Sequence, residues 1–261
     1  MNRSKQPPVL ILHATGTNRD REAAWAVELA GGRPTTLHVN ALRENSRRLH
    51  GYRMLVLPGG FSYGDDLGAG RLWATDLRWL FQDELARFVE AGKPVLGICN
   101  GFQALVKSGW LPGPPAAGAQ VTLTRNGSNR FECRWVWLEP NPASPCVFTR
   151  QLRERIHCPV AHGEGRFVPR DAAALAQLQA RQLVALTYAA ADGGPPAYPA
   201  NPNGSVADIA GICNEQGNVL GLMPHPEDHV IPWQHPRWSR GERGNMGLAL
   251  FEAGAHYAAG L

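Results

Sequence analysis

One stretch organises the whole chain: Val95-Leu96-Gly97-Ile98-Cys99-Asn100-Gly101-Phe102-Gln103. Its first four residues are an apolar run that predicts a short buried strand, and the residues from Gly101 onward predict the first turns of a helix. Glycines stand two residues before and two residues after Cys99. That spacing is the pattern of a nucleophile elbow, a tight strand-to-helix turn in which both flanking positions crowd the backbone and a missing Cβ relieves the crowding.

A cysteine at such a turn can act as a nucleophile. At a helix N-terminus the thiol lies beside unpaired N–H groups and the positive end of the helix dipole, which favours the thiolate that attacks a carbonyl carbon. The backbone N–H of Asn100 points to where an oxyanion would form. The alternative is a buried structural cysteine between unrelated glycines, and a second signal far downstream makes that alternative less favourable.

The second signal is the segment Gly221-Leu-Met-Pro-His-Pro-Glu227. Its two prolines disfavour helical backbone at the residues before them, so we predict an extended chain in which His225 and Glu227 point to the same side. The carboxylate can then hold the imidazole while the imidazole faces Cys99, which predicts a Cys-His-Glu triad. Without the elbow, His225 would be interpreted as a surface histidine in a loop between prolines.

With these two motifs the sequence resembles the class I, triad-type glutamine amidotransferases. More narrowly, it is similar to the family of glutaminase subunits of phosphoribosylformylglycinamidine synthase, an enzyme of de novo purine synthesis. The resemblance runs from about residue 8 to about residue 228. One departure is Asp228, where many relatives carry an arginine, and the tail at 230–261 matches nothing and has no assigned role. The narrower match rests on three stretches, Leu57-Pro-Gly-Gly-Phe-Ser-Tyr-Gly-Asp65, Ala161-His-Gly-Glu-Gly-Arg-Phe167 and Tyr198-Pro-Ala-Asn-Pro-Asn-Gly-Ser205.

The resemblance implies a fold, a reaction and partners. The fold is α/β: an open, mainly parallel, doubly wound, flavodoxin-like sheet with an antiparallel addition. The reaction is hydrolysis of the glutamine side-chain amide through a cysteine thioester. The ammonia passes to a separate ATP-dependent synthetase subunit that makes formylglycinamidine ribonucleotide, and a small bridging subunit can join the two. The glutaminase half-reaction needs no cofactor, and ATP and Mg²⁺ are expected on the partner synthetase.

The resemblance also assigns residues around the triad. The loop after the strand at 53–57 supplies a second oxyanion N–H, which we place at Gly60, beside Gly59. Gln103 lines the glutamine pocket, and the backbone near His162 and Gly163 holds the α-amino and α-carboxylate groups of glutamine. The alternatives are a mobile surface loop for residues 58–66 and a plain loop residue for His162.

Composition limits the other classes of function. The 261 residues suffice for one large domain, so we expect a single amidotransferase domain over 1–261. The net charge of +4 is too small and scattered to indicate nucleic-acid binding. Five cysteines without a CxxC spacing indicate reduced thiols in a cytoplasmic protein. No signal-peptide pattern and no apolar run of transmembrane length is present, so no membrane association is expected.

The remaining pattern predicts alternating strands and helices, then a β-rich second half. The segments 112–130 and 189–205 are rich in loops and could face a partner. Arg130, Glu132 and Arg134 share one face of a strand, which is either solvated or docks a partner or a phosphate. The predicted strands are 8–13, 35–39, 53–57, 95–98, 121–124, 131–138, 182–188, and a hairpin of 209–213 with 218–223; the predicted helices are 19–30, 77–91 and 247–258.

Two other functions stay open at this point. One is a class I amidotransferase that serves another acceptor synthetase, and the three partner-specific stretches disfavour it. The other is a non-catalytic relative that keeps the fold as a binding or sensing module, and the intact triad pattern disfavours it. The sequence contains no Walker A pattern, so any phosphoryl chemistry is expected on a partner.

Overall fold

The computed structural model describes residues 6–114, 118–242 and 244–261, and its main feature is one nine-stranded sheet. A second sheet has two antiparallel strands, β5 (Val121–Thr124) and β8 (Arg166–Pro169). In order across the large sheet the strands are β2 (Arg33–His38), β1 (Pro8–His13), β3 (Met54–Leu57), β4 (Val95–Ile98), β11 (Val219–Leu222), β10 (Ile209–Cys213), β9 (Val184–Ala189), β6 (Glu132–Pro140) and β7 (Ile156–His162).

The large sheet has a parallel part and an antiparallel part. The parallel part consists of β2, β1, β3, β4 and β11. Next to β11 the antiparallel part begins, with β10, β9, β6 and β7 in that order. The predicted class, a doubly wound parallel sheet with an antiparallel addition, is therefore confirmed. The strands β3, β4 and β11 are buried at every position, as expected for strands covered on both faces.

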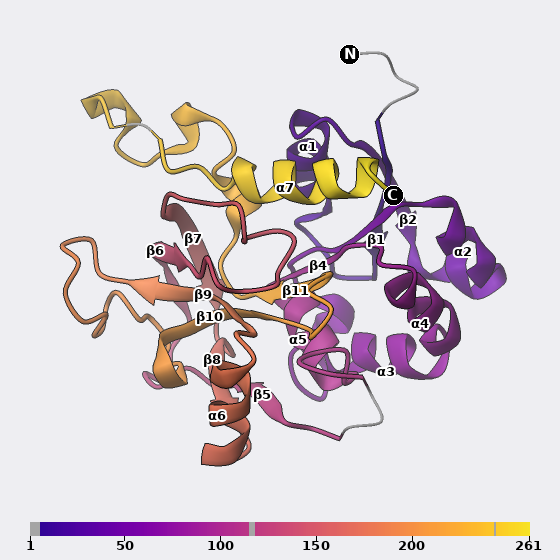
Figure 1. Cartoon of the computed structure of the whole chain (residues 1–261), viewed down its shortest axis with the longest axis horizontal. Helices are drawn as coiled ribbons and strands as arrows, with labels where there is room; N and C mark the ends of the chain where they lie inside the picture. The colour runs from indigo at the N-terminus through magenta and orange to yellow at the C-terminus, as the bar shows by residue number, and fades with distance from the viewer. Residues whose placement is uncertain (1–5, 115–117, 243) are drawn as a thin grey trace.

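Helices cover both faces of the parallel part (Figure 1). On one face lie α1 (Asp20–Leu29) and α7 (Leu248–Ala259), and on the other lie α3 (Arg71–Trp79), α4 (Gln82–Glu90) and α5 (Asn100–Lys107). The short α2 (Val39–Glu44) follows β2, and α6 (Ala172–Ala180) follows β8. This arrangement leaves the carboxyl ends of β1, β3, β4 and β11 side by side, which is where open α/β sheets place their sites.

The prediction of one helix over 77–91 is wrong. The chain forms two helices, α3 and α4, with a corner at Leu80 and Phe81. Phe81 is 3 % exposed and has non-helical backbone (φ −125°, ψ 8°). The corner lets each helix bury its own apolar residues against the sheet, which one straight helix would not do.

The sequence-based predictions also did not include α2, β7, β8 and α6. Of these, α6 carried a usable signal, because Asp171 caps its N-terminus by accepting a hydrogen bond from the backbone N–H of Ala174. Both α2 and β8 are short, and their sequences carry no apolar period, whereas β7 alternates buried and half-buried residues. Most remaining boundaries differ from the predicted ones by one or two residues, which is the ordinary uncertainty of an element end.

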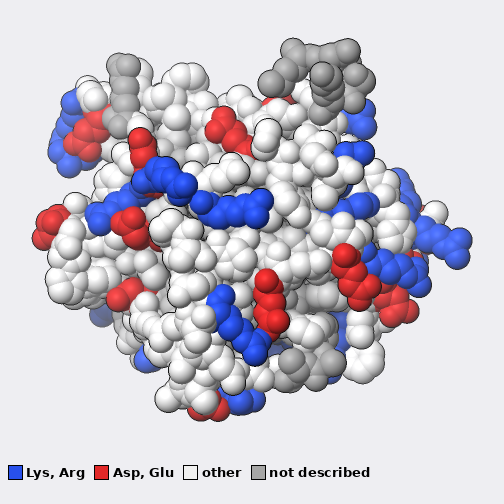
Figure 2. Space-filling view, in the orientation of Figure 1, with Lys and Arg blue, Asp and Glu red and all other residues white. Residues whose placement is uncertain are grey.

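Charged side chains of both signs are interspersed on the face shown in Figure 2. The small positive net charge therefore forms no continuous basic surface there. Among the helices in the described ranges, none is both long enough and apolar enough to cross a membrane.

Candidate active site

Cys99 lies in the turn between β4 and α5 and has a left-handed backbone (φ 50°, ψ −103°). Such a conformation costs a non-glycine residue about 1–3 kcal/mol and therefore needs support from the surroundings. The two glycines give that support by allowing close packing. A Cβ on Gly101 would lie 1.9 Å from the Leu57 carbonyl oxygen, and one on Gly97 would lie 2.9 Å from the Gly101 carbonyl oxygen. The elbow geometry predicted from the glycine spacing is present.

His225 and Glu227 form a buried hydrogen-bonded pair at the carboxyl end of β11. The distance from His225 Nδ1 to Glu227 Oε1 is 2.7 Å, and the two residues are 3 % and 0 % exposed. Burial alone lowers the pKa of His225, but the negative charges of Glu227 and of a Cys99 thiolate outweigh burial and hold that pKa well above its ordinary value. The Glu227 carboxylate therefore favours the protonated form of the imidazole.

The prediction of extended backbone through Glu227 is wrong in its second half. Residues Pro226–Asp228 form a 3₁₀ turn, and the Asp228 N–H donates to the His225 carbonyl oxygen at 3.3 Å. Proline at the first position of such a turn is favourable because its N–H would be unpaired in any case. The turn still brings the Glu227 carboxylate onto the imidazole, so the expected contact forms through different backbone.

The imidazole of His225 lies against the elbow and the loop after β3. A Cβ on Gly59 would lie 2.6 Å from His225 Cε1 and 3.5 Å from Cys99 Cβ, so the Gly59 backbone passes over both side chains. His225 Nε2 is buried and has no hydrogen-bond partner in the part of the chain that the structure describes. The Cys99 thiol is 3.8 Å from the Ala161 carbonyl oxygen, across the site on β7. Because Nδ1 is paired with Glu227, Nε2 is the imidazole nitrogen that remains for Cys99.

Two backbone N–H groups are available to bind an oxyanion. Over the described residues, no hydrogen bond from the N–H of Gly60 or of Asn100 is found. Gly60 has φ 141° and forms an isolated β-bridge with Thr17, and a Cβ there would lie 2.7 Å from the Asn18 nitrogen. A glycine is therefore required at this position, both for its backbone angle and for space.

The side chain of Asn100 joins the elbow to the loop at 58–66. Its Oδ1 accepts a hydrogen bond from the Ser62 N–H (3.1 Å), and its Nδ2 donates to Asp65 Oδ1 (2.8 Å) and to Gln103 Oε1 (3.0 Å). Gln103 in turn donates from Nε2 to the Glu164 carbonyl oxygen at 2.7 Å. The elbow helix therefore holds both neighbouring segments through amide side chains.

His162 lies at the end of β7 and is 3 % exposed, so the alternative that it is a plain loop residue is excluded. Burial, and then the charge of His225, lower the pKa of His162 to about 3, so the ring is neutral at physiological pH. Its Nδ1 pairs with Asn126 Oδ1 at 3.1 Å, while Asn126 donates from Nδ2 to the His162 carbonyl oxygen and from its N–H to the Gly163 carbonyl oxygen. The turn expected to hold the glutamine backbone is thus fixed by one asparagine.

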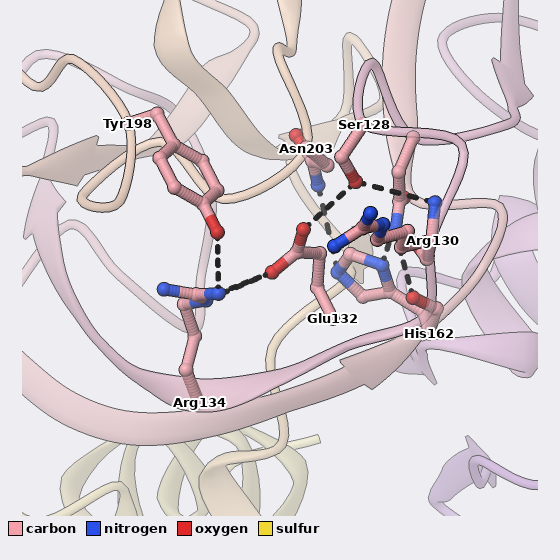
Figure 3. A network of polar contacts seen from close by, with 8 residues as sticks. Ser128, Arg130, Glu132, Arg134, His162, Tyr198 and Asn203 are labelled. Atoms are coloured by element: carbon pink, nitrogen blue, oxygen red, sulfur yellow. Dashed lines mark hydrogen bonds and ion pairs between the residues drawn. The ribbon is translucent and has the colours of Figure 1, made fainter.

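A polar network extends from this turn to the loop at 195–204 (Figure 3). Glu132 is 3 % exposed and accepts hydrogen bonds from Ser128 Oγ at 2.8 Å and from Arg134 Nε at 2.9 Å. Arg134 also donates to the Tyr198 hydroxyl at 2.8 Å. A solvated strand face is therefore the wrong description of Glu132, whose carboxylate is buried and paired within the chain.

The sequence reading missed the asparagines that build this region. Asn203 donates from Nδ2 to the Gly165 carbonyl oxygen (2.9 Å) and to the Tyr188 hydroxyl (3.0 Å). Asn126 precedes a glycine, and an Asn-Gly dipeptide indicates only a turn. Asn203 lies in the stretch Tyr198–Ser205, which resembles the family. Neither signal alone could assign a buried role to these side chains.

Two clusters contain residue types that can bind a metal ion. Of the residues that the structure describes, His225, Glu227 and Asp228 are the one group whose ligand-type atoms lie within 4.8 Å of one another, and two of the three, His225 and Glu227, are already paired in a hydrogen bond. His157 Nδ1 and His235 Nε2 are 3.1 Å apart, but His235 Nδ1 accepts from the Arg237 N–H, so its Nε2 carries the proton that it donates to His157. Neither arrangement is that of a metal site.

A thiol at a strand-to-helix turn, a buried imidazole–carboxylate pair and two free N–H groups together suit acyl transfer with hydrolysis. The family profile that matches this chain, over residues 6–258, is the CobB/CobQ-like glutamine amidotransferase domain. The chain belongs to this glutamine amidotransferase family.

Two relatives with the same name are similar to this chain over most of its length. The chain is 49 % identical to "Phosphoribosylformylglycinamidine synthase subunit PurQ" of Treponema denticola, over 97 % of this chain and 99 % of that protein. It is 47 % identical to the subunit of the same name from Dehalococcoides mccartyi, over 88 % of each. Among solved structures, a chain in the structure of PurLQS from Thermotoga maritima is similar with a TM-score of 0.74 and 33 % identity, covering 97 % of this chain and 99 % of that one.

Proposed function

We propose that this chain is the glutaminase subunit of a phosphoribosylformylglycinamidine synthase. It hydrolyses the side-chain amide of glutamine and supplies the ammonia to a separate synthetase subunit in purine biosynthesis. The similarity to PurQ subunits over nearly the whole chain supports the choice of enzyme. The observation that carries the chemistry is the buried His225–Glu227 pair, whose free Nε2 lies beside the Cys99 elbow under Gly59.

The first half of the reaction breaks the C–N bond of the amide. His225 Nε2 takes the thiol proton of Cys99, and the sulfur attacks the carboxamide carbon. The N–H groups of Gly60 and Asn100 donate to the oxyanion of the tetrahedral intermediate. His225 then gives its proton to the departing nitrogen, so that ammonia leaves and a glutamyl thioester remains on Cys99.

The second half of the reaction returns the enzyme to its starting state. His225 Nε2 removes a proton from water, and the resulting hydroxide attacks the thioester carbon while the same two N–H groups hold the oxyanion. The intermediate collapses to glutamate, and the sulfur leaves as the thiolate beside the protonated imidazole. Glu227 keeps the imidazole in one orientation through both halves.

The substrate pocket follows from the fixed turn after β7. Glutamine would extend from Cys99 toward the backbone at His162 and Gly163, whose carbonyl oxygens are already held by Asn126. Gln103 lines the same space from α5 and keeps the turn in place through Glu164. His162 is neutral and adds no charge to the pocket; its Nδ1 donates to Asn126 Oδ1, so its Nε2 is an acceptor, and this nitrogen lies 3.5 Å from Asn203 Nδ2.

The remaining chemistry belongs to partners. The similar chain from Thermotoga maritima belongs to a PurLQS structure, and we infer that this chain likewise assembles with a synthetase subunit and a small bridging subunit. ATP and Mg²⁺ act on the synthetase, and the glutaminase residues named above need no cofactor. We place the complex in the cytoplasm, where the five cysteines of this chain stay reduced.

The test is release of glutamate from glutamine, measured with this chain alone and with its synthetase partners. We expect hydrolysis that depends on Cys99 and increases in the complex. A glutamine-like electrophile should modify Cys99 before the exposed Cys133, and glutamine should protect Cys99 alone, as followed by peptide mapping. Absence of glutamate release in the complete complex would reject the proposed function, and release driven only by a different synthetase would change the acceptor.

A further inference from the structure

The loop between β1 and α1 lies beside the oxyanion loop. Thr17 forms the isolated β-bridge with Gly60, the Phe61 N–H donates to the Gly16 carbonyl oxygen at 3.0 Å, and the Arg19 N–H donates to the Gly59 carbonyl oxygen at 3.3 Å. The backbone of residues 16–19 therefore holds the two glycines that pass over the triad.

The side chain of Arg19 reaches the other half of the site. Its Nε lies 3.7 Å from Asp228 Oδ2, and its Nη1 lies 3.4 Å from Glu22 Oε1. Asp228 ends the 3₁₀ turn that begins at Pro226, and its N–H donates to the His225 carbonyl oxygen. Arg19 thus touches the oxyanion loop through its backbone and the turn of the general base through its side chain.

Several charged or titratable groups face the Asp228 carboxylate. Glu227 and His225 lie on its own turn, Arg19 and Glu22 approach from the start of α1, and Cys158 faces it from β7. Burial and the neighbouring Glu227 charge raise the pKa of Asp228 to about 6, whereas His225 and Arg19 oppose the rise. The two neighbouring cations therefore favour the ionised form of this carboxylate.

We propose that Arg19 and Asp228 are a positioning pair for the glutaminase reaction: their ion pair fixes the loop that carries the Gly60 N–H relative to the turn that carries His225. This inference rests on the proposed function. Charge develops at both places in the transition state, on the oxyanion and on the imidazole. A displacement of about 1 Å between such groups can cost 10²-fold in rate, so a link between their two supports acts on kcat.

The test is a double-mutant cycle in the assembled complex, with Arg19→Met, Asp228→Asn and the double variant. Each single variant should lower kcat about 3- to 10-fold with KM within about twofold, because the pair touches no substrate. The double variant should lose no more than the worse single variant. Arg19→Lys, which keeps the charge, should restore most of kcat. Multiplying losses in the double variant would overturn the proposal.

The matched control is Arg21→Met, which removes an exposed cation from the same helix start without touching Asp228. We expect wild-type kcat for it. Thermal unfolding of each variant identifies any that fails to fold, and if Arg19→Met fails, Arg19→Gln, which also removes the charge, takes its place in the cycle with Asp228→Asn. If wild-type complex releases no glutamate, the proposed function fails. If wild-type complex is active and the cycle is multiplicative, only the positioning pair fails.

The pH dependence separates positioning by charge from a purely structural role. Asp228 ionises as the pH rises through about 6, and only the ionised form can pair with Arg19. The ratio of wild-type kcat to Asp228→Asn kcat should therefore be largest above pH 7 and approach one below pH 5. A ratio that stays constant across this range would show that the side chain acts through shape alone, and would overturn the proposal.

Discussion

The elbow at Cys99 and the loop at 58–66 follow neighbouring strands, yet they are held in opposite ways. The elbow has one non-glycine residue with positive φ, Cys99, fixed between a buried strand and a helix. The loop region has three, at Tyr63, Asp65 and Leu67, along with Gly60 and Gly64. The nucleophile is therefore supported by regular secondary structure, and the oxyanion donor by individual contacts.

The difference has an energetic consequence. Three non-glycine residues in the left-handed region cost about 1 kcal/mol or more each, so the loop keeps its conformation only while outside groups hold it. Those groups include the Asn100 side chain, Asp76, which pairs with the Tyr63 hydroxyl, and the bridge to Thr17. A partner that alters these contacts can change oxyanion binding without moving Cys99. The elbow supplies the nucleophile, and the loop supplies an oxyanion donor whose position affects the rate.

The largest effect is expected at the elbow itself. Cys99→Ala should lower glutamine hydrolysis by about 10³-fold or more, since the nucleophile acts as a unit with His225. The fold should persist, because the strand, the helix and both glycines remain. Glutamate release and thermal unfolding check both statements. Wild-type turnover by the alanine variant would remove Cys99 from the mechanism and end the comparison.

Gly60→Ala tests the other side of the comparison. The added Cβ would meet Thr17 and Asn18 at 2.8 Å and 2.7 Å, which displaces the oxyanion N–H. We expect kcat to fall about 10²- to 10³-fold, as for loss of one oxyanion donor, with KM changed much less. Steady-state kinetics in the complex decide the matter. An effect confined to KM would mean that Gly60 serves glutamine binding instead.

A pair of glycine substitutions compares the two supports by stability. Gly101→Ala should destabilise the chain by about 3 kcal/mol or more, because its Cβ would collide with the β3 backbone. Gly64→Ala meets no atom closer than 3.7 Å and suffers only from its φ of 69°, which costs about 1–2 kcal/mol. Denaturant unfolding measures both values. Equal losses would contradict the view that the elbow at Gly101 is packed more tightly than the loop at Gly64.

The smallest effect is expected from the partner. Adding the synthetase subunit should raise kcat about tenfold while KM changes less, because oxyanion binding matters only as charge develops in the transition state. Kinetics at saturating glutamine, with and without partner, test this. A change in KM alone would instead show that the partner orders the turn at His162 and Gly163. Equal turnover with and without the partner would show that the partner does not act on the loop at 58–66.

Much of the fold could be predicted from local patterns. The strands at 8–13 and 95–98 have the predicted boundaries, and the hairpin of β10 and β11 forms around its glycine turn. These segments are continuous apolar runs closed by glycines or turn residues, so their neighbours in sequence suffice to define them. The elbow belongs to the same class, because its crowding arises within a few residues of Cys99.

The predictions fail where packing against residues distant in sequence decides the local backbone. The break at Phe81 follows from packing two helix faces on one sheet, and the turn after His225 follows from its place beside β7, where the His225 N–H donates to the Pro159 carbonyl oxygen. Neither cause lies within the local window that a periodicity argument uses. Local propensity is a weak prior at such places, and tertiary packing overrides it.

The sequence by itself determined the chemical groups of this protein: a cysteine at an elbow, and a histidine and a glutamate two residues apart. Only the tertiary structure decided that they meet, because β4 and β11 are neighbours in the sheet. It alone also decided the buried roles of Asn126 and Asn203 and the pairing of Arg19 with Asp228. The physical reason is that a hydrogen bond or ion pair needs atoms placed within about 3–4 Å by segments remote in sequence, and a single polar contact leaves no periodic signal in the chain.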